Sequence, residues 1–174
     1  MPILDIVEYP DPVLRQQASP VSEFDSQLAA LVHDLTQTLY STSGIGLSAP
    51  QVARSLQIMV MDLSDNQSRT DVLINPQIVN KAGLAIIEES CLSIPGISAK
   101  VMRASGVRVR FQDLTGSTEE RDFEGMQAVC IQHEIDHLQG VLFFDRISRL
   151  RRYRLRHVLR SLEHNTTSSA AHAV

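Results

Sequence analysis

The stretch GMQAVCIQHEIDHL, residues 125–138, decides the fold, because it predicts a mostly buried helix that carries two histidines and two acids. Its apolar positions include Met126, Val129, Cys130 and Ile131. Gly140 follows shortly afterwards, where a glycine commonly ends a helix. A buried helix does not turn imidazoles and carboxylates inward unless a partner satisfies them. A bound metal ion is such a partner.

Within this helix, the pentapeptide His133-Glu134-Ile135-Asp136-His137 has the spacing of a metal site. Residues four apart lie one turn apart on the same helix face, so the two imidazoles can bind one divalent ion. Glu134 points to the same neighbourhood and can carry the proton of a metal-bound water. The same string also occurs in proteins with the histidines as ordinary helix residues, and the motif by itself does not separate these interpretations.

Length and composition describe a globular protein of one domain. A chain of 174 residues can bury a substantial core, and its apolar content of 43% and charged content of 21% are ordinary. Nothing in the sequence resembles a transmembrane span, a signal peptide or a transit peptide, so we expect a cytoplasmic protein without a membrane partner. The two cysteines, Cys91 and Cys130, are too few for a disulfide framework and are expected to be free thiols.

The elements before the central helix mix strands with one further helix. A helix is predicted over residues 26–40, capped by Asp25 or Ser26, and a glycine-rich loop follows at residues 43–51. Strands are predicted at residues 57–62, 71–75, 85–88, 107–112 and 119–123. The last two read as a hairpin. Because strands and helices do not alternate as βαβ units, we predict an α+β fold with mostly antiparallel sheets around the central helix.

After the central helix we predict a short strand at residues 141–144 and an amphipathic, arginine-rich C-terminal helix over residues 148–163. One side carries a stripe of arginines, and the apolar other side is expected to pack on the domain: the stripe is Arg146, Arg149, Arg152, Arg156 and Arg160, and the apolar side Ile147, Leu155, Val158, Leu159 and Leu162. Two interpretations remain open, a solvated basic face or an electrostatic footprint for RNA. We assign residues 1–164 to the domain and predict a disordered tail over residues 165–174.

Two histidines need a third protein ligand, which leaves one coordination position for water. Downstream of the motif, the sequence offers Asp145, His157, Glu163, His164 and His172. Upstream it offers Cys91, which follows a predicted strand and whose thiolate would bind a borderline metal well. Cys130 is better explained as a small buried hydrophobe than as a ligand.

Three segments together resemble peptide deformylases: Gly44-Ile-Gly-Leu-Ser-Ala-Pro-Gln51, Glu89-Ser-Cys-Leu-Ser93 and His133-Glu-Ile-Asp-His137. They match the three motifs of that family in order and in approximate spacing, and the likeness extends from residues 9–15 to residues 140–143. Ser48 and Ser90 stand where the family usually has Ala and Gly. The family removes the formyl group from the N-terminal formyl-methionine of new bacterial polypeptides and releases formate.

The resemblance implies the chemistry of the site. It makes Cys91, His133 and His137 the metal ligands, and Glu134 the general base and acid for attack by a metal-bound hydroxide on the formyl group. One divalent metal is implied, with Fe²⁺ expected for activity and Zn²⁺, Ni²⁺ or Co²⁺ able to occupy the site in preparations. Apart from the resemblance, two acids keep two interpretations each: Asp136 either orients a ligating histidine or pairs with Arg103, and Glu89 is either solvated or pairs with Arg103.

The resemblance also places the substrate, a formyl-methionyl peptide. Gln51 and the backbone N–H of Leu92 become the donors to the developing oxyanion. The peptide is expected to pair in extended form with the backbone near Ile45 and Gly46. The pocket for the methionine side chain would be lined by Ile45, Ile87, Met126, Val129 and Cys130. Contact with the ribosome through the arginine-rich helix is favoured, and no DNA partner is expected.

Two rival functions remain. A zinc endopeptidase requires a third metal ligand downstream of His137 and leaves Gln51 and Cys91 unexplained. A catalytically silent relative that only binds ribosomes is disfavoured, because the chain keeps every implied ligand and Glu134.

Overall fold

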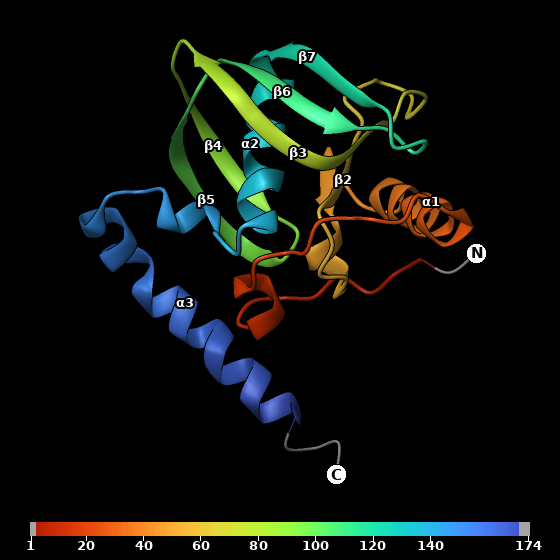
Figure 1. Ribbon diagram of the computed structural model, residues 1–174. Helices are drawn as coiled ribbons and strands as arrows, with labels where there is room; N and C mark the ends of the chain where they lie inside the picture. The colour runs from red at the N-terminus through yellow and green to blue at the C-terminus, as the bar shows by residue number, and fades with distance from the viewer. Residues whose placement is uncertain (1–2, 171–174) are drawn as a thin grey trace.

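The computed structural model describes residues 3–170 and has the predicted α+β fold (Figure 1). Its main sheet has five antiparallel strands in the order β1-β2-β3-β6-β7. These strands are β1 (Gly46–Ser48), β2 (Ile58–Met61), β3 (Asp71–Ala82), β6 (Gly106–Gln112) and β7 (Thr118–Glu124). A separate hairpin joins β4 (Ala85–Cys91) to β5 (Ile94–Arg103).

The central helix α2 (Gly125–Leu138) has the predicted bounds and lies between the main sheet and the β4–β5 hairpin (Figure 1). Gly125 has a φ of +57°, a backbone conformation that glycine adopts without strain, and it lets the chain turn directly from β7 into the helix. One face of α2 packs on the inner side of β6, where Val107, Val109 and Phe111 alternate with exposed arginines. The opposite face carries the two histidines of the pentapeptide toward the hairpin.

Helix α1 (Ser26–Tyr40) covers β1 and β2 and agrees with the prediction. The Asp25 side chain caps it by accepting hydrogen bonds from the backbone N–H groups of Gln27 and Leu28. Its buried stripe packs with Leu47, Ile58 and Val60 of the two strands and holds the glycine-rich loop in place. That loop continues through β1 into the short 3₁₀ helix η2 (Ala49–Val52).

The predicted strand at residues 141–144 is wrong, because this segment leads into the 3₁₀ turn η3 (Phe143–Asp145). Three successive side chains, those of Leu142, Phe143 and Phe144, are all buried against the β4–β5 hairpin, whereas a strand would turn successive residues to opposite faces. Asp145 ends the turn by accepting a hydrogen bond from the Leu142 N–H. The prediction also missed β1 and β5 and ended β3 and β4 too early.

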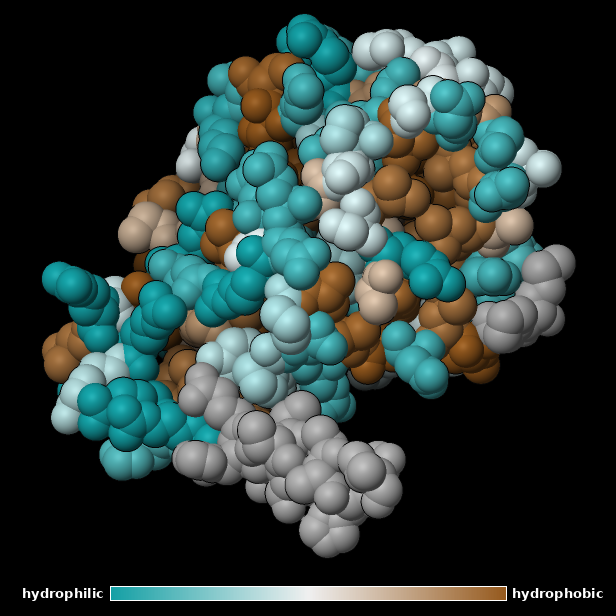
Figure 2. Space-filling view, turned by 60° about the horizontal axis from the view of Figure 1, so that its bottom comes forward, coloured by the Kyte–Doolittle hydropathy of each residue, from teal (hydrophilic) through white to brown (hydrophobic). Residues whose placement is uncertain are grey.

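The C-terminal helix α3 (Arg149–Ala170) is longer than predicted. We expected a disordered tail over residues 165–174, but the helical backbone continues through residue 170. Residues 171–174 lie outside the described residues. Leu155 and Leu159 pack against the body, but Val158, from the predicted apolar side, is 46% exposed. Hydrophilic side chains cover the first part of α3 (Figure 2).

We predicted that the whole arginine stripe faces away from the domain, and this is wrong for two of its arginines. Arg146 pairs with the buried Asp136 of α2, and Arg152 lies over the Phe144 ring while pairing with Asp145. Two of its five arginines are therefore held by the body. Among residues 3–170, no helix is long and apolar enough to cross a lipid bilayer.

Candidate active site

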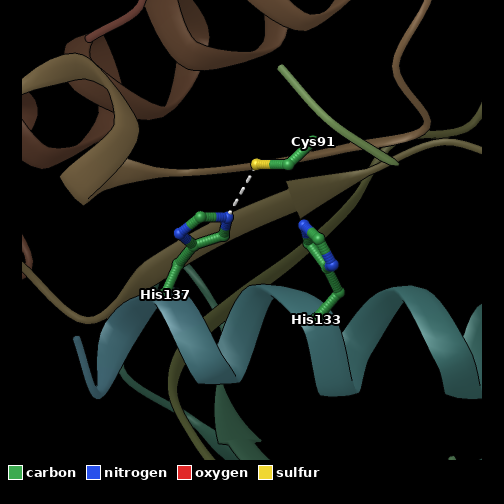
Figure 3. A group of neighbouring side chains, drawn as sticks. All are labelled: Cys91, His133 and His137. Carbon is green, nitrogen blue, oxygen red and sulfur yellow. Dashed lines mark hydrogen bonds between the residues drawn. The ribbon is translucent and has the colours of Figure 1, made fainter. Parts of the chain in front are cut away.

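Cys91, His133 and His137 form a cluster at the centre of the molecule, as predicted (Figure 3). The two histidines project from one face of α2 toward Cys91, the last residue of β4. Their potential ligand atoms all lie within 4.8 Å of one another, and the Cys91 sulfur is 3.1 Å from Nε2 of His137. Cys91 is only 8% exposed and His137 only 1%. The fold thus brings Cys91 to two histidines that lie at least 42 positions further along the sequence.

The donors of this cluster fit a divalent metal. Nδ1 of His133 lies 2.9 Å from a carboxylate oxygen of Glu89, which leaves Nε2 for a metal. Burial lowers the pKa of His137 well below its ordinary value and so favours the neutral imidazole, the form that binds metals. Burial alone would also lower the pKa of His133, but hydrogen bonds with Cys91 and Glu89 outweigh it and raise that pKa. One thiolate and two imidazoles leave a coordination position free for water.

Glu134 lies beside the cluster with one carboxylate oxygen available. The residue is 3% exposed, and Oε2 has no hydrogen-bond partner among the described residues. Burial raises the pKa of Glu134, although the nearby His133 opposes this rise. Gly46 makes the close approach of β1 to α2 possible, because a Cβ there would lie 2.9 Å from Oε1 of Glu134 and 2.5 Å from the Cys130 sulfur.

The Gln51 amide is fixed with its NH₂ group toward the cluster. Oε1 accepts hydrogen bonds of 2.9 Å from both the backbone N–H and the hydroxyl of Ser48. Nε2 consequently faces the other way, 3.6 Å from the Cys91 sulfur and 3.4 Å from the Ser93 hydroxyl. Ser48, one of the two departures from the usual family sequence, is thus fully buried and orients a predicted site residue. The other departure, Ser90, is exposed in the cavity wall.

A cavity of about 450 Å³ opens beside the cluster and brings together eleven of the twelve predicted site residues. They are Ile45, Gly46, Gln51, Ile87, Cys91, Leu92, Met126, Val129, Cys130, His133 and Glu134. The twelfth, His137, lies deeper, at the closed side of the cluster. Ile45 and Met126 are 40% and 46% exposed, so they flank the cavity where it meets solvent. The walls are mostly apolar.

A buried ionic network supports the cluster from behind. Arg103 donates to both carboxylate oxygens of Glu89, at 2.7 and 3.0 Å, which confirms the predicted pair. Asp136 accepts from Arg103 at 2.6 Å and from Arg146, so of the two predicted roles it takes that of an arginine partner. We did not anticipate Arg146, since its position in the arginine stripe gave no signal of a buried partner.

The chain resembles known proteins over nearly its whole length. The sequence model described as polypeptide deformylase matches residues 3–153. The peptide deformylase of Alkalilimnicola ehrlichii is 47% identical over 163 residues, which cover 93% of this chain and 92% of that protein. That of Acidobacterium capsulatum is 51% identical over 154 residues, covering 87% and 91%.

Solved structures agree. The crystal structure of a peptide deformylase from Legionella pneumophila superposes with a TM-score of 0.87 at 40% identity, covering 95% of this chain and 98% of the other. A plant peptide deformylase superposes with a TM-score of 0.92 at 39% identity, covering 97% and 93%. The α+β fold, the metal-binding cluster and the sequence together define a metallohydrolase. The chain belongs to the polypeptide deformylase family, as its motifs predicted.

Proposed function

We propose that this protein removes the formyl group from the N-terminal formyl-methionine of nascent polypeptides, and that residues 1–164 form its catalytic domain. One observation carries this proposal: a possible metal site, an unpartnered carboxylate oxygen and an oriented amide NH₂ group meet in one apolar cavity. Hydrolysis of a formamide needs an activated water, a proton carrier and donors for an oxyanion. The cavity supplies a candidate for each.

Cys91, His133 and His137 would hold the metal. When bound, the metal supplies a Lewis acid that acidifies the attacking water. We propose Fe²⁺ as the active metal, because a mixed sulfur and nitrogen donor set suits iron as well as zinc, nickel and cobalt, and because the family resemblance favours iron. Glu89 holds His133 through Nδ1 and so fixes the direction in which Nε2 points.

Glu134 carries the proton. Its free Oε2 accepts the proton of the attacking water, and the same oxygen then returns it to the departing amine nitrogen. Burial supports this double use, because it raises the pKa of the carboxyl group and makes the protonated form easier to reach. Of the two other carboxylates that line the cavity, Glu89 is bonded to Arg103 and His133, and the exposed Glu88 accepts a hydrogen bond from the Ser98 hydroxyl.

Gln51 and the N–H of Leu92 stabilise the negative charge that develops on the formyl oxygen. The Nε2 group of Gln51 already faces the Cys91 sulfur, and Leu92 directly follows Cys91 and lines the same cavity. Donors that are fixed before the reaction need no reorganisation when the charge develops. Ser48 supplies that fixation for Gln51.

The cavity suits an extended peptide that begins with methionine. Gly46 belongs to β1, which lies at one edge of the main sheet, so the backbone of Ile45 and Gly46 can pair with an added strand. The methionine side chain would occupy the apolar wall formed by Ile45, Ile87, Met126, Val129 and Cys130. Cys130 is buried there and does not belong to the group of possible metal ligands among residues 3–170, which supports its role as a small apolar side chain.

We propose that the enzyme works in the cytoplasm and meets its substrate at the ribosome through α3. Arg149, Arg156 and Arg160 line a cleft of about 370 Å³ with the aromatic side chains of Tyr9, Phe144 and Tyr153. Arginines beside aromatic rings are common in RNA-binding surfaces. Because Arg146 and Arg152 are held by carboxylates of the body, the proposed footprint is restricted to the other three arginines of the stripe.

The endopeptidase alternative loses support. Within residues 3–170, the side chain that joins the two histidines is Cys91, upstream of the motif, and not an acid or histidine downstream. Asp145, a downstream candidate, instead pairs with Arg15 and Arg152.

The test is formate release from a formyl-Met tripeptide by anaerobically purified, iron-loaded protein. The matching acetyl-Met tripeptide should not be hydrolysed, and no internal peptide bond of a longer substrate should be cleaved. Internal cleavage, or equal activity on the acetyl peptide, would reject the proposal.

A further inference from the structure

A chain of charged side chains leads from a proposed metal ligand to the base of α3. His133 is bonded to Glu89, Glu89 to Arg103, Arg103 to Asp136, and Asp136 to Arg146. The first four residues belong to α2 and the β4–β5 hairpin, whereas Arg146 lies between η3 and α3. Arg146 uses Nε and Nη2 to bind both oxygens of Asp136, with a Nε–Oδ2 distance of 3.0 Å.

Among Glu89, Arg103, Asp136 and Arg146, the negative and positive charges are equal in number, and Arg146 supplies one of the two positive charges. Glu89, Asp136 and Arg103 are 6%, 4% and 5% exposed, so two carboxylates and one guanidinium lie in the interior. A buried carboxylate without a compensating charge is strongly unfavourable. The side chain of Arg146 is 44% exposed and brings the second positive charge to Asp136 from the surface.

The position of Arg146 is itself well fixed. Its neighbour Asp145 pairs with Arg15 and with Arg152, and it also accepts a hydrogen bond from the Leu142 N–H. The backbone from which Arg146 reaches α2 is therefore anchored on three sides. A planar guanidinium can engage both oxygens of a carboxylate at once, which a lysine ammonium cannot do with the same geometry.

We propose that Arg146 is a positioning residue for the metal centre. By neutralising Asp136, it leaves Arg103 free to hold Glu89 with two hydrogen bonds, and Glu89 in turn holds His133. Without Arg146, the two carboxylates compete for one guanidinium, and Glu89 loses its fixed orientation. This inference rests on the proposed function to the extent that it takes His133 as a metal ligand. Mutating a group that orients a ligating histidine typically lowers metal affinity by about 10- to 100-fold.

Three variants test the proposal. Arg146→Met removes the charge, Arg146→Lys keeps the charge without the paired hydrogen bonds, and the double variant Asp136→Asn/Arg146→Met removes one charge of each sign. The asparagine oxygen can still accept the hydrogen bond from Arg103. Arg108→Met is the matched control, because Arg108 makes the same two-pronged pair with Asp122 on the exposed side of β6 and β7.

The readout is cobalt binding, followed by the absorption bands of the thiolate–cobalt centre and by the rate at which a chelator removes the ion. We expect Arg146→Met to release cobalt about tenfold faster than the wild type and to shift its ligand-field bands. The cobalt release rate of Arg146→Lys should lie between those of Arg146→Met and the wild type. The double variant should recover most of the cobalt retention that Arg146→Met loses. Arg108→Met should behave like the wild type. The kcat for a formyl-Met tripeptide should follow the same order, with KM nearly constant.

The possible failures are distinguishable. A wild-type cobalt protein without a thiolate band would reject the proposed ligands, and with them the proposed function. With that band present, wild-type cobalt retention by Arg146→Met would overturn the role of Arg146. Equal losses in Arg146→Met and in the double variant would also overturn it, because charge balance would then not be the cause. The lysine and double variants carry the test if Arg146→Met does not fold.

Discussion

Ser48 directs both of its hydrogen-bond donors at a single atom, Oε1 of Gln51, each at 2.9 Å. The amide group of a glutamine has an oxygen that accepts hydrogen bonds and an NH₂ group that donates them. Fixing the oxygen therefore also fixes the direction of the NH₂ group. A family member with alanine at this position keeps the backbone donor and loses the hydroxyl. The hydrogen bond from the backbone N–H can therefore form with either residue, whereas the hydrogen bond from the hydroxyl forms only with serine.

Replacing Ser48 with alanine should lower kcat modestly and leave KM nearly unchanged. One neutral hydrogen bond contributes about 1 kcal/mol, or roughly fivefold in rate. Replacing Gln51 with alanine should cost on the order of 100-fold or more, because it removes an oxyanion donor. Steady-state kinetics on a formyl-Met tripeptide measure both. A Ser48→Ala loss as large as that of Gln51→Ala would assign the hydroxyl a direct catalytic role.

Changing Glu134 to glutamine should abolish nearly all activity and leave the metal content intact, because it removes the proton carrier but none of the proposed ligands. Cys91→Ser should instead weaken metal retention, since an alcohol is a poor substitute for a thiolate. Metal analysis of the purified variants, combined with formate assays, separates the two effects. Turnover by Glu134→Gln at a rate close to the wild type would show that the general base is another group.

Iron-loaded protein should lose activity in air, because the thiolate and the open coordination position expose the centre to oxidation. Nickel- or cobalt-loaded protein should last longer, and zinc-loaded protein should be stable but slow. The measurement is the half-life of formate release under air and under nitrogen for each metal. Fast and air-stable turnover with zinc alone would contradict the assignment of iron and revive the endopeptidase alternative.

Ribosome binding should weaken and become less salt-dependent when Arg149, Arg156 and Arg160 are all replaced by glutamine. Each arginine that contacts a phosphate releases a counterion, so loss of three contacts should reduce the logarithmic salt slope by roughly 2 to 3. Co-sedimentation with ribosomes across a salt series measures this. The control is Arg108→Gln/Arg110→Gln, which removes two exposed arginines of β6. Unaltered co-sedimentation of the triple variant would reduce these arginines to a solvated face. Tripeptide hydrolysis, measured in parallel, reveals any damage to the fold.

The stability of the metal-free protein should fall in acid partly through Glu89. Burial alone would raise the pKa of Glu89, but hydrogen bonds from Arg103 and His133 lower it to about 2. An unfolded glutamate titrates at about 4.3, so the pair stabilises the fold above that pH, and this contribution is lost as pH falls toward about 2. The contribution is on the order of 2 to 3 kcal/mol.

Urea unfolding between pH 7 and pH 2.5 measures this contribution. Glu89→Gln should flatten the pH dependence, whereas Glu120→Gln, which removes an exposed carboxylate paired with Arg110, should not. Identical slopes for the wild type and Glu89→Gln would show that the network does not depress the pKa of Glu89.

Sequence patterns predicted best where periodicity and chemistry agreed. The bounds of α2 are as predicted, because its apolar spacing, its pentapeptide and Gly140 all indicate the same helix. β5 was missed because Pro95, Gly96 and Ser98 interrupt the alternation that marks a strand. The apolar run at residues 141–144 has too few residues to show a period, and tertiary packing decided its conformation.

The site was predictable as a set of residues but not as a network. The proposed ligands, Glu134, Gln51 and Leu92 lie in three local motifs, and each motif is readable by itself. The other predicted cavity residues lie within these motifs or a few positions before them. The second arginine partner of Asp136, Arg146, could not be read in this way, because helical periodicity assigned it to an exposed stripe. A pair between residues ten positions apart in two different elements depends on how the chain turns at η3.

The β4–β5 hairpin shares no ladder with the main sheet, and Cys91 stands on this hairpin, whereas both histidines stand on helix α2. An ion that binds all three is therefore a cross-link between two separately hydrogen-bonded units. It also sets an order of events during synthesis, since the second histidine is residue 137 of 174. A newly made copy of this enzyme cannot complete its own centre until synthesis has passed residue 137.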